Sequence, residues 1–424
     1  MISDSGIWYP DPIEKRIAPV SFARPRPLAV RARTWICDGR GKIIRRGQEV
    51  WNTITDYGMD LLATNTPDAI CTYLVLSSVL GPAKKVLTGG TTLSITSVAD
   101  PTNLAVVASA NFFASGDVGN TLYIDGLGQE LKITAYTDAQ HVTCATRQSL
   151  WLPGISPTTG PFSTAGVHYT ATNTVNTEIT RFNTYDTSSP NYNTQLNDSA
   201  NSRWIHQRIF LSGTAPGSWT INQLGWTPNS AANSNVFGKV NLITPDNVAT
   251  GQKYRVQLDF YSGYTPINQS SVPVNWGATI GSYNLNIRQE VIAQDTSNSI
   301  RNFLQPTLMT LSNSFWWTNT FTLATTKWQG DAGYVANPHT GPAGSTSTND
   351  LSDAAYTNGT FFKQRTWKFL DTIAISAATG LTVGNTVSGP EPLTIQPATG
   401  TITKPTGYWC ALTFPIYWTR ALTN

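Results

Sequence analysis

Two pairs of carboxylates stand close enough in the sequence to support acid–base chemistry. Asp350 and Asp353 lie in the segment TNDLSDAAY, and Asp56 and Asp60 are spaced to share one helix face. A glycosidase needs two carboxylates about 5 to 10 Å apart beside aromatic subsites. Asp350 and Asp353 are therefore the candidate catalytic or ligand-binding pair of a glycan depolymerase. The Asp56–Asp60 spacing is ordinary for a solvated helix face.

Other catalytic and metal-binding patterns are missing. The four histidines and four cysteines are far apart, and the sequence holds no HExxH, CxxC, GxSxG or GxxxxGK[ST] motif. Scattered cysteines of this kind are typical of free thiols made in a reducing cytoplasm. We therefore predict a non-enzymatic protein that uses no cofactor and no metal.

Tryptophans are concentrated late in the chain, where Trp316 and Trp317 are adjacent. Neighbouring residues on a strand point to opposite faces, so one ring of this pair must leave the core of its own sheet. We interpret the pair as part of a subunit interface, because aromatic side chains concentrate at interface cores. The alternative is a sugar-stacking surface that includes Trp328 and the loop 330–360.

The charge is unevenly distributed. Residues 1–46 hold ten basic side chains and four acids, a net charge of +6, whereas the whole chain has a net charge of +3. Five prolines interrupt residues 1–33, and proline removes a backbone donor, so we expect an extended arm there and no central strand.

The basic arm is compatible with solvent, with nucleic acid or with an acidic neighbouring subunit. Nucleic-acid binding is the less favoured alternative, because the prolines favour threading along a protein surface. We therefore assign the arm to contacts between subunits. The predicted interface residues are Arg24, Arg26, Arg31, Arg33, Trp35, Trp316 and Trp317.

The composition indicates a folded, β-rich chain. Charged residues make up 12% and aromatic residues 11% of the 424 residues, whereas disordered chains carry high charge and few aromatics. The abundant Thr, Ser, Asn and Gly favour strands and turns over long helices. No apolar run of about 18 residues occurs, so we expect no membrane span, and the N-terminus does not read as a signal peptide.

Local patterns predict the elements. Residues 34–46 are typical of a hairpin that turns at Asp38-Gly39. A short helix follows, capped by Asn52 or Thr53, and the glycine inside it at position 58 suggests close packing. Residues 70–80 form a buried strand, and apolar residues alternate with polar ones over 254–260, as in a half-buried strand.

The sequence thus predicts an all-β fold: an antiparallel β-sandwich or jelly-roll-like core with one short helix, a small inserted β domain and an extended N-terminal arm. The arm and hairpin cover 1–48, and the helix and first core strand cover 49–88. The evenly spaced short strands of 89–152 form the insertion, and 153–424 form the sandwich with long surface loops.

Several segments resemble elements of tailed-bacteriophage virion proteins of the tail, collar or tail-fibre-associated families. The first is Asn52 followed by DYGMDLLA (56–63). The others are the aromatic-rich strand from Arg203-Trp204 to Phe210, then INQLGWTPNS (221–230), NVFGKVNLITP (235–245), GQKYRVQLDF (251–260) and the β segment 117–144.

The resemblance implies a virion structural role, self-assembly and no cofactor. We therefore expect a non-enzymatic structural component of the tail or head–tail region, made in the host cytoplasm, that contacts copies of itself and other virion proteins. The alternative is a receptor- or carbohydrate-binding tail protein that contacts host surface glycan through Trp328, Asp350 or Asp353, and the less favoured one is a glycan depolymerase.

Overall fold

The computed structural model describes 18–19, 26–51, 53–63, 70–81, 84–86, 90–124, 127, 129–151, 157–162, 166–169, 172–198, 203–263, 268–289, 315–318, 344–345, 351–353, 355–369, 374–378, 380–383, 393–408 and 410–420. Strands dominate these residues, and their sheets are largely antiparallel, with one short α-helix. The predicted all-β fold class is confirmed. Among the described residues, no helix is long and apolar enough to cross a membrane.

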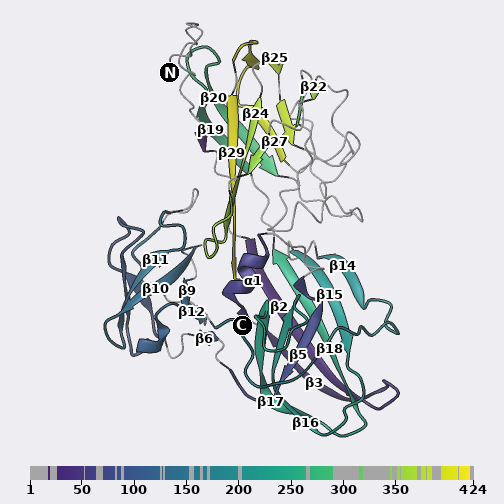
Figure 1. Cartoon of the computed structure of the whole chain (residues 1–424). Coiled ribbons are helices and arrows are strands. Elements are labelled where there is room, and N and C mark those ends of the chain that lie inside the picture. Colours follow the sequence, from purple (N-terminus) through teal and green to yellow (C-terminus); the bar gives the residue numbers. More distant parts are fainter. Residues whose placement is uncertain are drawn as a thin grey trace, which may run out of the picture.

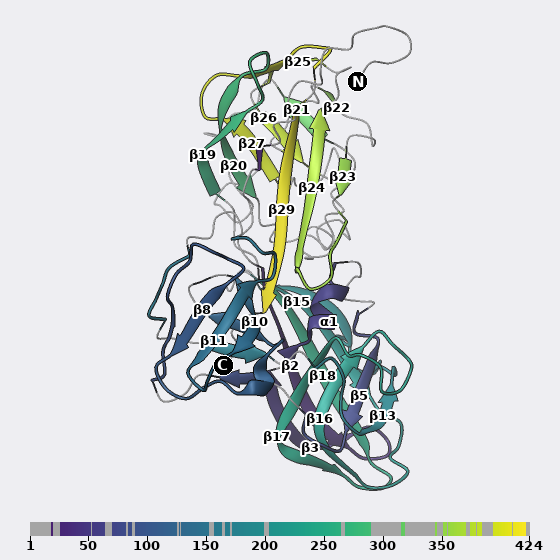
Figure 2. The same ribbon diagram turned by 60° about the vertical axis from the view of Figure 1, so that its left-hand side comes forward.

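The body of the molecule is a sandwich of two sheets (Figures 1 and 2). One layer contains β14 (Asn193–Asp198), β15 (Arg203–Leu211), β18 (Lys253–Gly263), β2 (Arg26–Cys37) and β3 (Ile43–Trp51). The facing layer contains β13 (Glu178–Phe182), β5 (Tyr73–Ser77), β16 (Trp219–Thr227), β17 (Gly238–Val248) and β4 (Thr53–Ile54).

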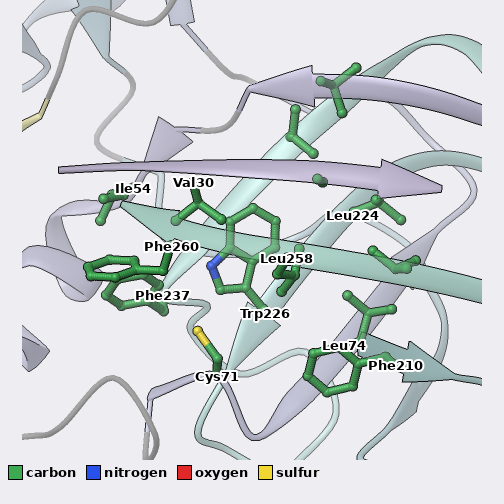
Figure 3. Packing of buried hydrophobic residues seen from close by; sticks show 14 of the residues in the cluster. Val30, Ile54, Cys71, Leu74, Phe210, Leu224, Trp226, Phe237, Leu258 and Phe260 are labelled. Carbon is green, nitrogen blue, oxygen red and sulfur yellow. The ribbon is translucent and has the colours of Figure 1, made fainter. Parts of the chain in front are cut away.

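The core of the body fills the space between these layers (Figure 3). Tyr254, Val256 and Leu258 of β18 face this core and are at most 1% exposed, as the sequence predicted, but Gln257, Asp259 and Tyr261 on the opposite face are buried as well. Trp226 of β16 and Phe237 meet them from the other sheet. The sandwich therefore joins residues 26–81 to residues 172–263, whereas the sequence predicted a sandwich that begins at residue 153.

The predicted arm is wrong for residues 26–33. They form the first part of β2, which lies between β18 and β29 (Cys410–Arg420) in the middle of a sheet. Leu28, Val30 and Ala32 are fully buried. Pro27 lies at the start of β2, where the strand pairs over only three residues with β29. Proline is tolerated at the end of a strand, so it did not prevent strand formation here. Most of the remaining arm lies outside the described residues, apart from the two-residue strand β1 (Ala18–Pro19).

The hairpin and the helix follow as predicted, with one change. β2 turns into β3 at 38–42, where Gly41 has a positive φ of 90°. Helix α1 (Asp56–Leu61) begins two residues later than expected, because β4 pairs with β17 first, and Thr55 caps it with its hydroxyl. A Cβ at Gly58 would lie 1.9 Å from the carbonyl oxygen of Phe237, which confirms the close packing.

The insertion is a separate β unit with its own core. It is wider than the predicted 89–152, because the strands at both its ends pair with it. Its seven strands are, in spatial order, β6 (Lys84–Val86), β12 (Gly166–Tyr169), β9 (Thr121–Ile124), β10 (Glu130–Tyr136), β11 (His141–Thr146), β8 (Leu104–Ala108) and β7 (Leu93–Ile95). Leu93 of β7 exchanges two backbone hydrogen bonds with Phe162, which precedes β12, so the sheet curls towards closure. A short 3-10 helix, Ser115–Asp117, precedes β9.

A third β unit lies at the other end of the molecule, above the body in Figure 1. Strand β29 runs from this unit down to the body, pairing first with β24 and then with the start of β2. The other strands of the unit are β19 (Asn268–Asn275), β20 (Ser282–Gln289), β21 (Phe315–Thr318), β22 (Gly344–Ser345), β23 (Leu351–Asp353), β24 (Phe362–Phe369), β25 (Ile375–Ala378), β26 (Gly380–Val383), β27 (Leu393–Pro397) and β28 (Ile402–Lys404).

Candidate functional site: a buried ionic junction and an arginine–aromatic face

Four charged side chains from three parts of the fold meet at one buried point. Asp56 is the first residue of α1 in the body, and Glu130 begins β10 in the insertion. Arg147 follows β11 in the insertion, and Arg420 ends β29. We call these four residues the ionic junction. The strand and helix ends that carry them converge where the body, the insertion and β29 touch.

The junction is a closed set of ion pairs. Arg420 contacts Glu130 at 2.7 Å through Nη1 and Asp56 at 2.5 Å through Nη2. Arg147 contacts Asp56 at 3.0 Å and Glu130 at 3.4 Å. Three of the four side chains are 2–3% exposed, and that of Asp56 is 19% exposed. Two positive and two negative groups therefore balance with almost no help from solvent.

Backbone groups and an aromatic ring complete the junction. Arg420 donates from Nε to the carbonyl oxygen of Ile54 at 2.6 Å, and its backbone N–H donates to Glu130 at 2.8 Å. Both guanidinium groups lie over the ring of Phe361, with the Cζ of Arg147 4.2 Å and that of Arg420 5.4 Å from its centroid. Such cation–π contacts gain strength when they are desolvated.

A second contact ties α1 to the loop before β24. Asp60 accepts a hydrogen bond of 2.5 Å from the Tyr356 hydroxyl and one of 2.7 Å from the N–H of Gly359. The Tyr356 ring stacks on Trp418, whose indole donates to the carbonyl oxygen of Met59 at 2.9 Å. Burial and the neighbouring Asp60 raise the pKa of Tyr356.

The sequence interpretation of Asp56 and Asp60 as an ordinary solvated pair is therefore wrong. Both carboxylates bind groups that lie more than 60 residues away in the chain. Spacing along one helix shows which residues share a face but not what covers that face. Here the insertion and the C-terminal strand cover it.

The junction is suited to holding elements together. Burial favours a raised pKa for Asp56, but the adjacent Arg420 and Arg147 outweigh it and hold the pKa below its usual value. A carboxylate kept ionised by two guanidinium groups is a weak proton acceptor, and arginine does not release a proton in proteins. The chemistry of the junction is therefore electrostatic cross-linking.

The outer face of the first body sheet carries a row of arginines and aromatic rings. Asp259 of β18 is buried and accepts from Arg31 at 2.8 Å and from Arg33 at 2.8 Å. The Cζ of Arg31 lies 5.7 Å from the ring centroid of Trp51 and 5.5 Å from that of Tyr261. We call this set the arginine–aromatic face.

Trp35, another predicted interface residue, lies on the same face. The Cζ of Arg255 is 4.8 Å from its ring centroid, and Arg255 also pairs with Asp186 at 2.6 Å. The structure thus brings Arg31, Arg33 and Trp35 to one face, where all three have partners within their own chain. Their contact with a second chain stays a prediction.

Four of the other predicted site residues lie on described strands. Arg26 is the first residue of β2, and Trp316 and Trp317 lie in β21, which confirms a strand for the adjacent tryptophans. Asp353 ends β23, where its backbone pairs with Arg365. Arg24, Trp328 and Asp350 lie outside the described residues.

No group of three or more His, Cys, Asp or Glu side chains that could hold a metal ion occurs in the part of the chain that the structure describes. Cys37, Cys71 and Cys144 are buried and their side chains are thiols, as the sequence predicted.

Sequence reasoning missed Glu130, Arg147 and Arg420. A signal was present for two of them, because Glu130 opens the apolar strand ELKITAY and Arg420 follows FPIYWT. A charge at the end of an otherwise apolar strand is seldom buried without a partner. The partner could not be identified, because it lies up to 364 residues away.

Comparisons with protein-family models, with curated proteins and with solved structures found no match for the chain.

Proposed function

We propose that this chain is a non-enzymatic structural component of a tailed-phage virion. It assembles as an oligomer at the tail or head–tail region and docks neighbouring virion proteins. The observation that carries the proposal is the ionic junction, which cross-links three β units of one chain by buried ion pairs.

A junction of this kind suits a protein whose task is to hold a shape. Breaking a buried ion pair by removing one partner costs about 3–5 kcal/mol, because the other charge is left uncompensated. Relative movement of the insertion and β29 would separate Arg420 from Glu130 and meet that cost. The arrangement therefore favours one fixed geometry, as particle assembly requires.

Most of the segments that resemble phage virion proteins lie in the body, whereas the segment 117–144 lies in the insertion. The aromatic-rich strand and GQKYRVQLDF lie on β15 and β18, which pair with each other. INQLGWTPNS and NVFGKVNLITP lie on β16 and β17 of the facing sheet, and 56–63 contains α1. Apart from the segment 117–144, which belongs to the core of the insertion, the resemblance falls on elements that share the core of the body.

The proposal is tested in the particle. We expect mass spectrometry of purified particles to find the chain in a fixed ratio to the major tail proteins. Deleting its gene should yield heads or tails that do not join, as seen by negative-stain electron microscopy. A particle that is complete and infectious without the chain would contradict the proposal.

The predicted arm is tested separately with a deletion that spares the body. Deleting residues 1–17 leaves β1 and β2 intact, whereas deleting 1–33 would remove buried core residues. If the arm joins subunits, the shorter deletion should lower the oligomer mass in sedimentation without changing the melting temperature. An unchanged oligomer would remove the arm from the assembly contacts.

The receptor- or carbohydrate-binding alternative rests on Trp328, Asp350 and Asp353. Host glycan should quench or shift tryptophan fluorescence if it holds, and Trp328→Ala should abolish that change. The depolymerase alternative predicts cleavage of host polysaccharide that is lost in Asp350→Asn with Asp353→Asn. The structural proposal predicts neither response.

A further inference from the structure

The β2–β3 hairpin ends in a tip, residues 38–46, that carries an unusual charge. Arg40, Lys42, Arg45 and Arg46 are all exposed, and Asp38 is the single acid among them. The tip has a net charge of +3, which equals the net charge of the chain. Residues 1–37 carry a further +3 and residues 47–424 a net charge of −3, so the tip holds half of the basic excess of residues 1–46.

The tip cations differ from the arginines that precede them in β2. Arg31 and Arg33 are paired with Asp259 on the arginine–aromatic face. Within the described residues, no carboxylate pairs with any of the four tip cations, and the polar contact of Arg45 is a hydrogen bond of 3.1 Å to the carbonyl oxygen of Asn247. The basic charge noted in the sequence is thus available at the tip.

The tip is held in one conformation. The Asp38 carboxylate accepts from the N–H groups of Arg40 and Lys42, each at 2.9 Å, so it is occupied by the turn. Gly41 takes a positive φ and Gly39 lies against the carbonyl oxygen of Gly251, so the turn rests on the body. The hairpin projects at the end of the body away from the upper β unit (Figure 1).

Two isoleucines are exposed between the cations. Ile43 is 47% and Ile44 is 51% exposed. The register shifts between Ile36 and Cys37, which pair with Arg45 and Ile43, so Ile44 is an extra residue in a β-bulge. Bulges re-aim side chains and block strand pairing. This one leaves two adjacent aliphatic side chains at the surface among four positive charges.

We propose that the hairpin tip docks into an acidic groove on a different protein. Charge complementarity requires a negative partner, and residues 47–424 of a second copy carry a net charge of only −3, so a more acidic protein fits the tip better. Arginines around apolar side chains are the composition of a protein interface. The inference rests on the proposed structural role, where the partner is a neighbouring virion protein.

Other anionic partners fit the tip less well. Single-stranded nucleic acid is bound by basic residues with stacking aromatics, and residues 38–46 contain no aromatic side chain. Insertion into a membrane would carry the charged apex, with Arg40 and Lys42, into the lipid ahead of the isoleucines, which is costly. A protein groove accommodates the apolar pair and places its acids at the rim.

The first experiment measures binding to a defined acidic probe. The full chain is titrated against a labelled peptide of alternating glutamate and leucine, against duplex DNA and against vesicles of phosphatidylcholine with phosphatidylglycerol. Changing Arg40, Lys42, Arg45 and Arg46 to Gln should weaken peptide binding on the order of tenfold or more. Changing Arg40, Arg45 and Arg46 to Lys keeps the charge and should retain most of the affinity.

The isoleucines have a matched control. Ile43→Ser with Ile44→Ser should weaken binding of the peptide. Val118→Ser with Leu150→Ser alters two aliphatic side chains that are each 46% exposed on the insertion side, and it should leave binding unchanged. Equal peptide affinity of the Gln variant and the wild type, or tighter tip-dependent binding of DNA or vesicles, would overturn the inference.

The second experiment identifies the partner in the particle. A photoreactive phenylalanine analogue in place of Ile44 should crosslink to another virion protein at an acidic segment, and the same analogue at Val118 should not. Crosslinks only to copies of this chain would overturn the inference and leave the virion role standing. If the chain is absent from particles while the peptide results hold, the virion role fails and the acidic docking tip survives.

Discussion

At the scale of single residues, the ionic junction shows how strongly the contribution of an ion pair to stability depends on its burial. Glu49 at the surface and Glu130 in the junction each lie beside an arginine, Arg31 and Arg420 respectively. The Glu49 pair is separated by 3.5 Å and is accessible to water, so it contributes little. The Glu130 pair is almost fully buried, so loss of either partner exposes the full desolvation cost of the other.

Acidification should act through Asp56. Its folded-state pKa is lowered, so its stabilising contribution is complete above the unfolded pKa of about 4 and is lost as the pH falls through the folded value. Asp56→Asn should lower the free energy of unfolding by about 3 kcal/mol at pH 7, the lower end of the range for a buried pair, because the Asp56 side chain is 19% exposed. The difference from the wild type should shrink below about pH 4.

Urea midpoints between neutral and strongly acidic pH measure this. Glu49→Gln, which changes an exposed carboxylate, is the control and should alter the free energy of unfolding by less than about 1 kcal/mol at any pH. A constant difference between Asp56→Asn and wild type across the whole range would show that Asp56 does not titrate in the folded state as described.

Lys239 is a buried amine on β17 whose Nζ donates to the carbonyl oxygen of Thr174 at 3.1 Å. Burial lowers its pKa to about 8. The unfolded chain therefore binds an extra proton between that value and about 10.4. Stability should rise with pH across this window and be lower by a constant amount beneath it.

Lys239→Met should remove the energetic cost of burying a charged amine, because methionine has a similar length and no charge. We expect the variant to have a free energy of unfolding about 1–2 kcal/mol higher than the wild type at pH 7. The rise of that free energy with pH above about pH 8, which the wild type should show, should be absent from the variant. Lys132→Met, at an exposed position of β10, is the control and should leave both unchanged. Destabilisation by Lys239→Met at pH 7 would mean that the charged amine is better solvated than its burial implies.

At the scale of elements, α1 is placed by a close approach to Phe237, the residue before β17. Glycine in a helix interior normally costs about 1 kcal/mol relative to alanine, so Gly58→Ala should stabilise an isolated helix. In the folded chain the new Cβ would lie 1.9 Å from the carbonyl oxygen of Phe237, which a helix cannot accommodate without shifting. We expect a loss of about 3 kcal/mol or more.

Chemical denaturation measures that loss, and Gly116→Ala is the matched control. Gly116 has open space around its Cβ position and no positive φ, so alanine there should change stability by less than about 1 kcal/mol. If Gly58→Ala were as mild as the control, α1 would have to move away from β17 freely. Such a movement of α1 would carry Asp56, a member of the ionic junction, away from the body core.

The sequence predicted elements well where the pattern is local. The alternation over 254–260, the turn at Asp38 and the inserted β unit all follow from neighbouring residues. The predicted arm over 26–33 failed because Pro25 and Pro27 disguise a strand whose alternating Leu28, Val30 and Ala32 face the core. The interface prediction for Arg31 and Arg33 lacked Asp259, more than 220 residues away. Local patterns carry no such partner information.

At the scale of the whole molecule, the ionic junction decides whether the insertion and the body behave as one unit. The insertion has a core of its own, so it can stay folded when the junction breaks. Arg420→Met should lower the stability of the body by about 3–5 kcal/mol. We expect calorimetry to resolve two unfolding transitions in place of a single cooperative one.

Two further variants sharpen this prediction. Arg181→Met breaks the Glu178–Arg181 pair inside the body and should destabilise it without separating the transitions. Replacing Asp56 and Glu130 by Leu together with Arg147 and Arg420 by Met removes the whole charged set and should recover part of the stability lost in Arg420→Met. A single transition in Arg420→Met would mean that other contacts couple the insertion to the body.

The parallel pairing of β2 with β29 affects how the nascent chain folds during translation. Leu28 pairs with Arg420, so the first part of β2 gains β29 as a neighbour only after a further 392 residues have been translated. At synthesis speeds of about 5–20 residues per second, β2 waits roughly 20 to 80 s for that strand. Contacts so distant in sequence also form slowly. A chain that ends before Arg420 has only Arg147 to balance Asp56 and Glu130, so its ionic junction is incomplete.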